Sequence, residues 1–326
     1  MREDLVRELE ADYEDRRREN ERIEQRRREE IRGRFPELGA LMNDREQMIY
    51  GTLRGILRGD AQTDGLPERM EALSARIRSA LEEKGYPANY LAPIYTCPLC
   101  RDTGYVGEPI REPCACMIRS YQQKLRERAG LNENNGETFE AFDPSVFPDT
   151  PLPGSSFSQR ILMQRTRELC ETWANTYPDS RYRDILLTGA SGLGKTFLLH
   201  AMASRLLDRG IQVRMISAFD FLQAARKSYF ENDAGLRELL ETQVLMLDDL
   251  GSEPMMQNIT IEQLFYLLNE RQMNQRATVI STNLDLKTLR TRYTERISSR
   301  ITDQRYCAVV PLLGVDIRQQ RGGKAP

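Results

Sequence analysis

The chain has 326 residues, of which 40% are hydrophobic and 29% charged, and its formal net charge is −2. This length allows two domains of ordinary size, and the composition predicts a soluble protein. No stretch approaches the roughly 20 apolar residues of a membrane span. The N-terminus lacks the apolar core of a secretory signal, so we expect a cytoplasmic protein without membrane contact. Because the net charge is near zero, any nucleic-acid binding must use a local basic patch.

Three helices are predicted at the start of the chain. Residues 1–35 are rich in Arg and Glu and contain no Pro or Gly before Gly33, which predicts a charged helix. This helix is either solvated or a partner-binding or coiled-coil arm. Amphipathic stripes follow at 38–57 and 66–81, with a turn-rich break between them. Such helices should pack as an antiparallel pair. The pair buries little surface, so we expect it to depend on a metal or a partner.

A metal site is predicted next. Four cysteines form two close pairs, Cys97-Pro-Leu-Cys100 and Cys114-Ala-Cys116. Four thiolates in this arrangement suit tetrahedral Zn²⁺ at a closed structural site. The only histidine lies on a later helix, which leaves the four cysteines as the plausible ligand set. Cys170 and Cys307 stand alone and are expected to be buried or partly buried thiols.

A linker is predicted at 132–156, where four prolines and an Asn-rich run follow a basic helical stretch. It separates an N-terminal domain at 1–131 from a second domain at 157–326. Phe139 and Phe142 are unusual in a flexible tether. They either pack locally on the second domain or fold over the nucleotide site predicted below.

A phosphate-binding loop is predicted at 189–196, where the sequence matches G-x-x-x-x-G-K-[ST] between a short apolar strand and an amphipathic helix. Glycines let successive N–H groups point at one anion, and the helix adds the positive end of its dipole. Lys195 supplies a charge to the phosphates, and the Thr196 hydroxyl ligates Mg²⁺. The predicted nucleotide-binding residues of this loop are Gly189, Ala190, Ser191, Gly192, Leu193, Gly194, Lys195 and Thr196.

Strands and helices then alternate, which predicts a parallel sheet with helices on both faces. The expected strands are 185–187, 212–217, 244–248, 278–282 and 307–312. The third strand ends in Asp248 and Asp249. Asp248 is expected to hold Mg²⁺, and Asp249 to orient the attacking water. Glu253 is a less favoured second acid, and Asn283 either contacts the γ-phosphate or water, or caps the following turn.

Together these motifs resemble the AAA+ ATPases, and within them the bacterial replicative helicase loaders of the DnaC/DnaI group and the IstB transposition ATPases. Leu247-Asp-Asp-Leu-Gly-Ser-Glu253 and Ile280-Ser-Thr-Asn283 carry this likeness, and the cysteine cluster followed by Glu137-Thr-Phe-Glu-Ala-Phe-Asp143 resembles the DnaI type. The resemblance implies an α/β fold with a five-stranded parallel sheet, behind a small helical, zinc-binding N-terminal domain. Little sequence follows Arg318, so no full C-terminal lid is expected.

The resemblance also implies residue roles. Asn283 matches sensor 1, Arg318 matches sensor 2, and Phe139 and Phe142 match the linker segment near the adenine. Arg300, with Arg296 as the alternative, matches the arginine finger that reaches the nucleotide of a neighbouring subunit. Asp249 stands where most AAA+ proteins have Glu, and its shorter side chain is consistent with slow hydrolysis.

The implied function is ATP-dependent loading of a hexameric, DnaB-type replicative helicase onto single-stranded DNA, with ATP, Mg²⁺ and Zn²⁺ as cofactors and self-assembly into a ring or spiral. The alternative is an IstB-type helper ATPase that binds DNA and a transposase. A non-enzymatic scaffold is disfavoured by the intact site residues. DNA contact is expected at Arg226, Lys227 and Tyr229, where basic and aromatic side chains lie together. An ordinary solvated helix face is the competing interpretation of that stretch.

Overall fold

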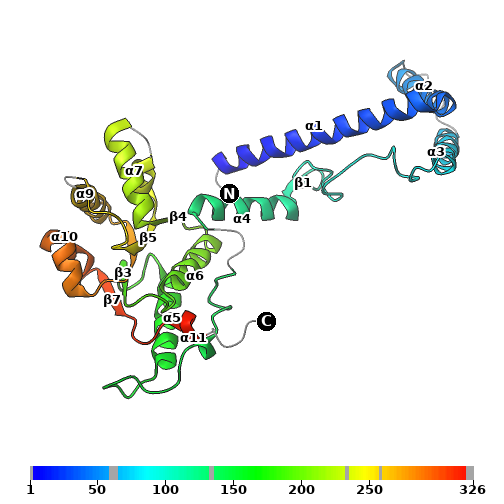
Figure 1. Cartoon of the computed structure of the whole chain (residues 1–326). Helices are drawn as coiled ribbons and strands as arrows, with labels where there is room; N and C mark the ends of the chain where they lie inside the picture. The colour runs from blue at the N-terminus through cyan, green and yellow to red at the C-terminus, as the bar shows by residue number, and fades with distance from the viewer. Residues whose placement is uncertain (1–2, 59–64, 132–135, 232–234, 257–258, 321–326) are drawn as a thin grey trace. The chain divides into compact units, whose positions relative to one another are not determined.

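The computed structural model describes residues 3–58, 65–131, 136–231, 235–256 and 259–320 (Figure 1). It separates into two compact units, Met1–Tyr121 and Gln122–Pro326. The domain and linker boundaries expected from the sequence remain predictions. No helix within the described ranges is both long enough and apolar enough to span a membrane.

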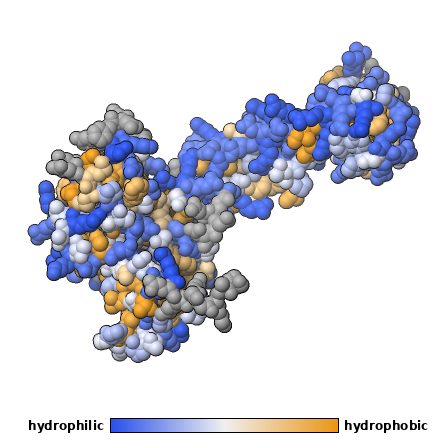
Figure 2. Space-filling view, in the orientation of Figure 1, coloured by the Kyte–Doolittle hydropathy of each residue, from blue (hydrophilic) through white to orange (hydrophobic). Residues whose placement is uncertain are grey.

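The first unit is built on three helices. They are α1 (Glu3–Arg34), α2 (Pro36–Arg58) and α3 (Leu66–Glu83). The end of α1 packs with α2 and α3 around a small core that includes Ile31, Leu38 and Leu81. The remaining surface of α1 is mostly hydrophilic (Figure 2), with ion pairs one turn apart such as Glu24–Arg28. The three helices thus agree with the expected pattern.

A second small core of this unit surrounds the cysteines. Leu9 and Tyr13 of α1 pack against Cys100, Cys114 and Met117. A short antiparallel pair, β1 (Tyr105–Val106) and β2 (Glu112–Pro113), lies between the cysteine pairs. Two-residue strands carry no periodicity, which is why the sequence analysis did not detect this pair. Helix α4 (Ala115–Ala129) follows β2 and contains the boundary between the units.

The second unit holds a five-stranded parallel sheet in the order β4-β5-β6-β3-β7. The expected all-parallel sheet is confirmed, and its strand ends differ from the predicted ones by at most two residues. The strands are β3 (Asp184–Thr188), β4 (Val213–Ser217), β5 (Val244–Leu250), β6 (Ala277–Thr282) and β7 (Cys307–Pro311).

Helices cover both faces of this sheet (Figure 1). Side chains alternate along each strand, so Ile185 and Leu187 of β3 face a core shared with α5 (Gln159–Thr176) and α6 (Lys195–Asp208). Leu186 faces the opposite core, made with the remaining long helices. These are α7 (Ala218–Glu231), α8 (Gly235–Glu241), α9 (Thr260–Met273) and α10 (Leu286–Ile301). In the described part, only the short α11 (Ile317–Gln320) follows β7.

The segment before α5 packs on the second unit. Phe139 and Phe147 are buried in the core beside α5 and α6, and Asp143 caps the single turn of 3-10 helix at Pro144–Val146. Local packing, one of the two expectations for this segment, therefore holds for Phe139. Phe142 is only half-buried and lies at the site described next.

Candidate functional site

The loop between β3 and α6 can follow the strand closely because two of its glycines adopt conformations that residues with a side chain rarely adopt. Gly189 has φ 143°, and a Cβ atom there would lie 2.3 Å from the carbonyl oxygen of Leu312. Gly194 has φ 86° and ends the loop, so that α6 begins at Lys195. The loop therefore wraps the N-terminus of α6, the geometry that binds phosphate.

Lys195 is the central cation of the site. Its side chain is only 6% exposed, and its Nζ donates hydrogen bonds of 2.7 Å each to the carbonyl oxygens of Gly189 and Ala190 and to Oδ1 of Asn283. Burial lowers the pKa of Lys195, while the carboxylates of Asp249 and Asp248 act in the opposite direction. A buried ammonium at the mouth of the phosphate loop is set to bind an anion strongly.

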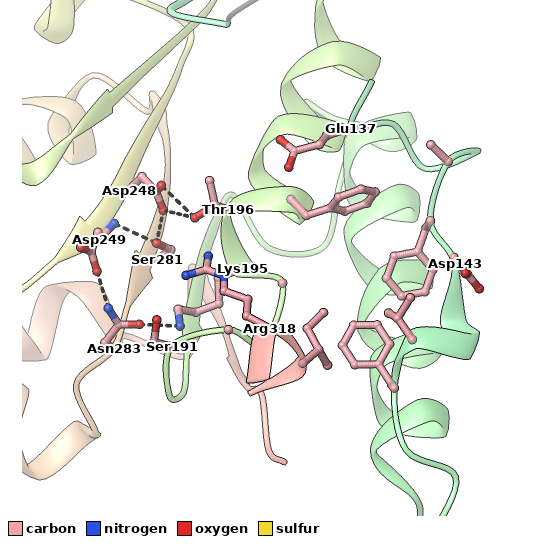
Figure 3. A pocket seen from close by; sticks show the side chains of 18 residues that line it. Glu137, Asp143, Ser191, Lys195, Thr196, Asp248, Asp249, Ser281, Asn283 and Arg318 are labelled. Carbon is pink, nitrogen blue, oxygen red and sulfur yellow. Dashed lines mark hydrogen bonds between the residues drawn. The ribbon is translucent and has the colours of Figure 1, made fainter. Parts of the chain in front are cut away.

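Thr196 and Asp248, the two residues predicted to hold Mg²⁺, are hydrogen-bonded to each other. The Thr196 hydroxyl donates to Asp248 Oδ2 at 3.0 Å. A hydroxyl beside a carboxylate at the end of a strand, next to the phosphate loop, is the oxygen donor set that suits Mg²⁺. Ser281 also donates to Oδ1 of Asp248, which fixes the rotamer of the carboxylate (Figure 3).

A bulge in β5 places both acids at the site. The register between β5 and β6 shifts between Leu247 and Leu250, so Asp248 and Asp249 together oppose Ser281. Asp249 has φ 56°, which is uncommon outside glycine. The Ser281 hydroxyl accepts the Asp249 N–H at 2.9 Å while it donates to Asp248. Ser281 thus stabilises the bulge, a role that the sequence analysis did not assign.

Asn283 belongs to the site and does not cap the following helix. Its amide nitrogen donates to Asp249 Oδ1, and its amide oxygen accepts from Lys195. The N-cap of α10 is Asp285, whose carboxylate accepts the N–H of Thr288 at 2.6 Å. Asn283 is thus directed at Lys195 and Asp249, and its role as a sensor remains a prediction.

These residues line a cavity of about 590 Å³ (Figure 3). Its polar wall is formed by Lys195, Thr196, the two acids and Asn283. Its apolar wall is formed by Phe142, Val146, Phe147, Phe197 and Ile317. The rings of Phe142 and Phe147 are stacked, with centroids 5.8 Å apart. An apolar wall opposite a phosphate-binding loop fits a nucleotide, with the base against the aromatic side chains.

Arg318 reaches the cavity because its segment is attached to two neighbours. The side-chain amide of Gln159 makes two hydrogen bonds of 3.0 Å with the backbone of Val315. The N–H of Ile317 donates to the Gly192 carbonyl at 3.2 Å. Arg318 thus lines this cavity, and its role as sensor 2 remains a prediction.

The other predicted functional residues lie elsewhere. Arg296 and Arg300 are on α10, with their guanidinium groups 4.8 and 4.5 Å from the ring centroid of Phe265, and neither is among the described residues that line the nucleotide cavity. Arg226 and Lys227 are exposed on α7. The side chain of Tyr229 lies outside the described part of the structure. Of the three residues expected to contact DNA, the structure therefore describes the side chains of Arg226 and Lys227.

The four cysteines of the first unit converge as a metal site would require. Their sulfurs all lie within 4.8 Å of one another, with 3.4 Å between Cys100 and Cys116 and 3.9 Å between Cys97 and Cys114. Tetrahedral Zn²⁺ with bonds of about 2.3 Å places its sulfur ligands about 3.8 Å apart. The cluster therefore fits a zinc ion. Cys170 and Cys307 are buried in the second unit, and burial raises the pKa of each thiol to about 12.

Asp102 holds the first cysteine pair in place through hydrogen bonds to the backbone. It is fully buried, and its carboxylate accepts the N–H groups of Thr96 and Cys97 at 2.7 and 2.8 Å. It also accepts the side-chain amide of Asn20 in α1 at 3.0 Å. One carboxylate thus orients the first cysteine pair and attaches it to α1, the kind of outer contact that metal sites depend on. Nothing in the residue pattern distinguished Asp102 from an ordinary turn residue.

Residues 166–325 match the model of the family described as IstB-like ATP binding protein. The second unit contains an IstB-like ATP-binding domain. This match, together with the parallel sheet and its phosphate-binding loop, confirms the expected P-loop α/β fold class. The residues assigned to the ATP site remain predictions.

Two proteins of Bacillus subtilis are similar in sequence to this chain. The chain is 27% identical to the phage-like element PBSX protein XkdC of Bacillus subtilis over 244 residues, which cover 71% of this chain and 87% of XkdC. It is 28% identical to the replicative helicase loader DnaI of Bacillus subtilis over 162 residues, 46% of this chain and 50% of DnaI. The chain thus spans about half the length of DnaI. A crystal structure of the DnaC helicase loader is 21% identical, with a TM-score of 0.45, over 54% of this chain and 97% of that one.

Proposed function

We propose that the chain is an ATP-hydrolysing loader that delivers a DnaB-type replicative helicase to single-stranded DNA. The observation that carries this proposal is the hydrogen-bonded set formed by Lys195, Asn283 and Asp249, next to Thr196 and Asp248, in an IstB-like ATP-binding domain. The likeness to DnaI supports the choice of a helicase as the partner.

The site can bind and hydrolyse ATP through residues with separate tasks. The backbone of the loop and Lys195 bind the phosphates, and Phe142 and Phe147 hold the base. Thr196 and Asp248 would hold Mg²⁺, which neutralises phosphate charge when bound. Asp249 would take a proton from the attacking water or orient it, and its bond to Asn283 fixes the direction of its carboxylate.

Hydrolysis is proposed to depend on assembly. Arg300 does not line the cavity of its own chain, and its guanidinium donates to the side chain of Asn269 in α9 at 3.2 Å. An arginine supplied by a neighbouring copy would stabilise the charge that develops on the transferred phosphate. ATP turnover would then report the formation of a ring or spiral, with Arg296 as the alternative donor.

The first unit is proposed to bind the helicase. Its four cysteines would hold Zn²⁺, which fixes the fold of a unit whose two apolar cores are small. The second half of α2 exposes Ile49, Leu53, Ile56 and Leu57 at helical spacing. This apolar face suits a partner surface better than water, and we assign the helicase to it. Single-stranded DNA is assigned to the surface of α7 around Arg226 and Lys227.

The test is capture of purified hexameric helicase by the full-length chain, with and without a zinc chelator. Zinc-dependent capture that is lost in a Leu53→Glu, Leu57→Glu variant, and kept when exposed Glu68 is changed to Gln, would support the loader. A chain that hydrolyses ATP and binds DNA but captures no helicase under any of these conditions would refute it, and a transposition ATPase would replace it.

A further inference from the structure

Glu253 is a buried acid that does not serve the nucleotide cavity directly. It lies in the segment after β5 and is only 2% exposed, yet it is absent from the described residues that line the cavity. One carboxylate oxygen accepts the N–H of Gly251 at 2.8 Å, and the other accepts the hydroxyl of Tyr293. Both oxygens therefore make hydrogen bonds away from the phosphate site, which argues against a role as second catalytic acid.

The loop that carries Glu253 is tightly connected to the catalytic end of β5. The N–H of Ser252 donates to the carbonyl of Asp249 at 3.1 Å, which closes a turn directly after the bulge. Gly251 has φ 112°, and a Cβ atom there would lie 2.7 Å from a methyl group of Leu284. The carboxylate of Glu253 holds this turn through the backbone N–H of Gly251. A shift of Asp249 would therefore move the turn and Glu253 with it.

The other end of the connection is α10. Tyr293 is completely buried, and burial, together with its hydrogen bond to Glu253, raises its pKa above the usual range. The hydroxyl thus remains a donor at neutral pH. A second contact runs in parallel, because Arg292 donates to the backbone carbonyl of Glu253 at 2.6 Å. Arg292 and Tyr293, two neighbouring residues of α10, therefore both donate hydrogen bonds to Glu253.

The helical backbone of α10 is interrupted immediately after Tyr293. Thr294 has φ 66° and ψ 161°, which are not helical values, and such a conformation persists in a residue with a side chain only where its surroundings impose it. Arg296 and Arg300 lie in the part of the helix beyond the kink. The direction of that part is set at Thr294, directly beside the residues that Glu253 holds.

We infer that Glu253 is a positioning residue that couples the catalytic end of β5, through Tyr293, to the arginine-bearing part of α10. The inference rests on the proposed ATPase function. Its consequence is that occupancy of the γ-phosphate site in one copy changes the direction in which that copy presents Arg296 and Arg300 to its neighbour. A buried carboxylate suits this role because its two oxygens can accept hydrogen bonds from Gly251 and from Tyr293 at the same time.

The test uses the full-length chain and two conservative variants, Glu253→Gln and Tyr293→Phe. Their matched controls are Glu262→Gln and Tyr266→Phe, which change exposed side chains of α9. Backbone hydrogen exchange is measured across residues 293–301 with and without a non-hydrolysable ATP analogue, beside analogue affinity and the kcat for ATP. Thermal unfolding confirms that each variant folds, and Tyr293→Phe, which removes one oxygen atom, is the milder change.

We expect the analogue to alter exchange in this segment of the wild type and of both controls. Both variants should bind the analogue within twofold of wild type, lose the change in exchange, and lose at least tenfold in kcat. A merely structural role would lower affinity and kcat together or leave the exchange response intact. The inference is overturned if wild type shows no response in α10, or if both variants keep the response. A wild type that responds but does not hydrolyse ATP would instead refute the proposed ATPase and leave the coupling in place.

Discussion

The ammonium of Lys195 donates a 2.7 Å hydrogen bond to the side-chain oxygen of Asn283, across the gap between the phosphate-binding loop and the end of β6. Asn283 in turn donates to Asp249. The residue that binds phosphate and the residue that would activate water are therefore joined through one amide. A γ-phosphate that draws Lys195 away from Asn283 would also change the environment of Asp249.

Replacing Lys195 by Met should weaken ATP binding by about 10- to 100-fold, since a hydrogen bond to a charged group contributes about 1.5–3 kcal/mol. The measurement is titration with a fluorescent ATP analogue. Lys287→Met, at an exposed position of α10, is the control and should bind as wild type does. Unchanged affinity in the Lys195 variant would mean that the nucleotide lies elsewhere.

Replacing Ser281 by Ala should lower kcat by about tenfold, with little change in affinity for ATP. The hydroxyl holds the Asp248 carboxylate and the N–H of Asp249 at once, and loss of such a bond costs about 1–2 kcal/mol. Thr291→Ala removes an exposed hydroxyl of α10 and serves as control. A loss of affinity equal to the loss of turnover would show that Ser281 supports binding and not the geometry of the acids.

Replacing Asp102 by Asn should reduce zinc affinity by about 10- to 100-fold, the usual effect of removing an outer hydrogen-bond partner of a metal ligand. The variant keeps the shape of the side chain but loses the charge that accepts the N–H groups of Thr96 and Cys97. Zinc is measured by competition with a chromogenic chelator, with exposed Asp44→Asn as control. A wild-type chain purified without zinc and unable to take it up would contradict the metal assignment itself.

Two inactive variants should complement each other. Lys195→Ala has a defective ATP site but still carries Arg300, and Arg300→Ala binds ATP but offers no arginine. If Arg300 acts on the nucleotide of a neighbour, a mixture of the two should hydrolyse ATP although neither does so alone. The same experiment with Arg296→Ala decides between the two arginines. Full activity of the Arg300 and Arg296 variants on their own would remove the need for assembly.

Regular elements and the phosphate loop could be predicted because they depend on local patterns. The apolar runs of the five strands, the glycines of the loop and the helix after Lys195 are all visible in short windows of sequence. The paired cysteines are similarly local, and the four sulfurs do converge. Even the position of Asn283 at a strand end follows from the rule that parallel strands present their carboxyl ends at one edge.

The contacts that refine the site depend on residues brought together by the sheet. Ser281 matters because β6 pairs with β5 across a bulge, and no window of sequence contains both strands. The sequence offers Glu253 as a possible second acid, but its carboxylate accepts a hydrogen bond from Tyr293, forty positions later in the chain. Asp102 serves the cysteines through backbone N–H groups, which leave no mark on residue type. Long-range pairing, rather than composition, decides these roles.

The most direct test of the loader function is the transfer of a purified hexameric helicase onto closed circular single-stranded DNA, which offers no free end. The complexes are separated from free protein by gel filtration, with wild-type chain, with the Lys195→Met variant, and without either. We predict ATP-dependent appearance of helicase on the circles with wild type only. Equal loading in all three samples, or none in any, would contradict the claim that this chain is a helicase loader.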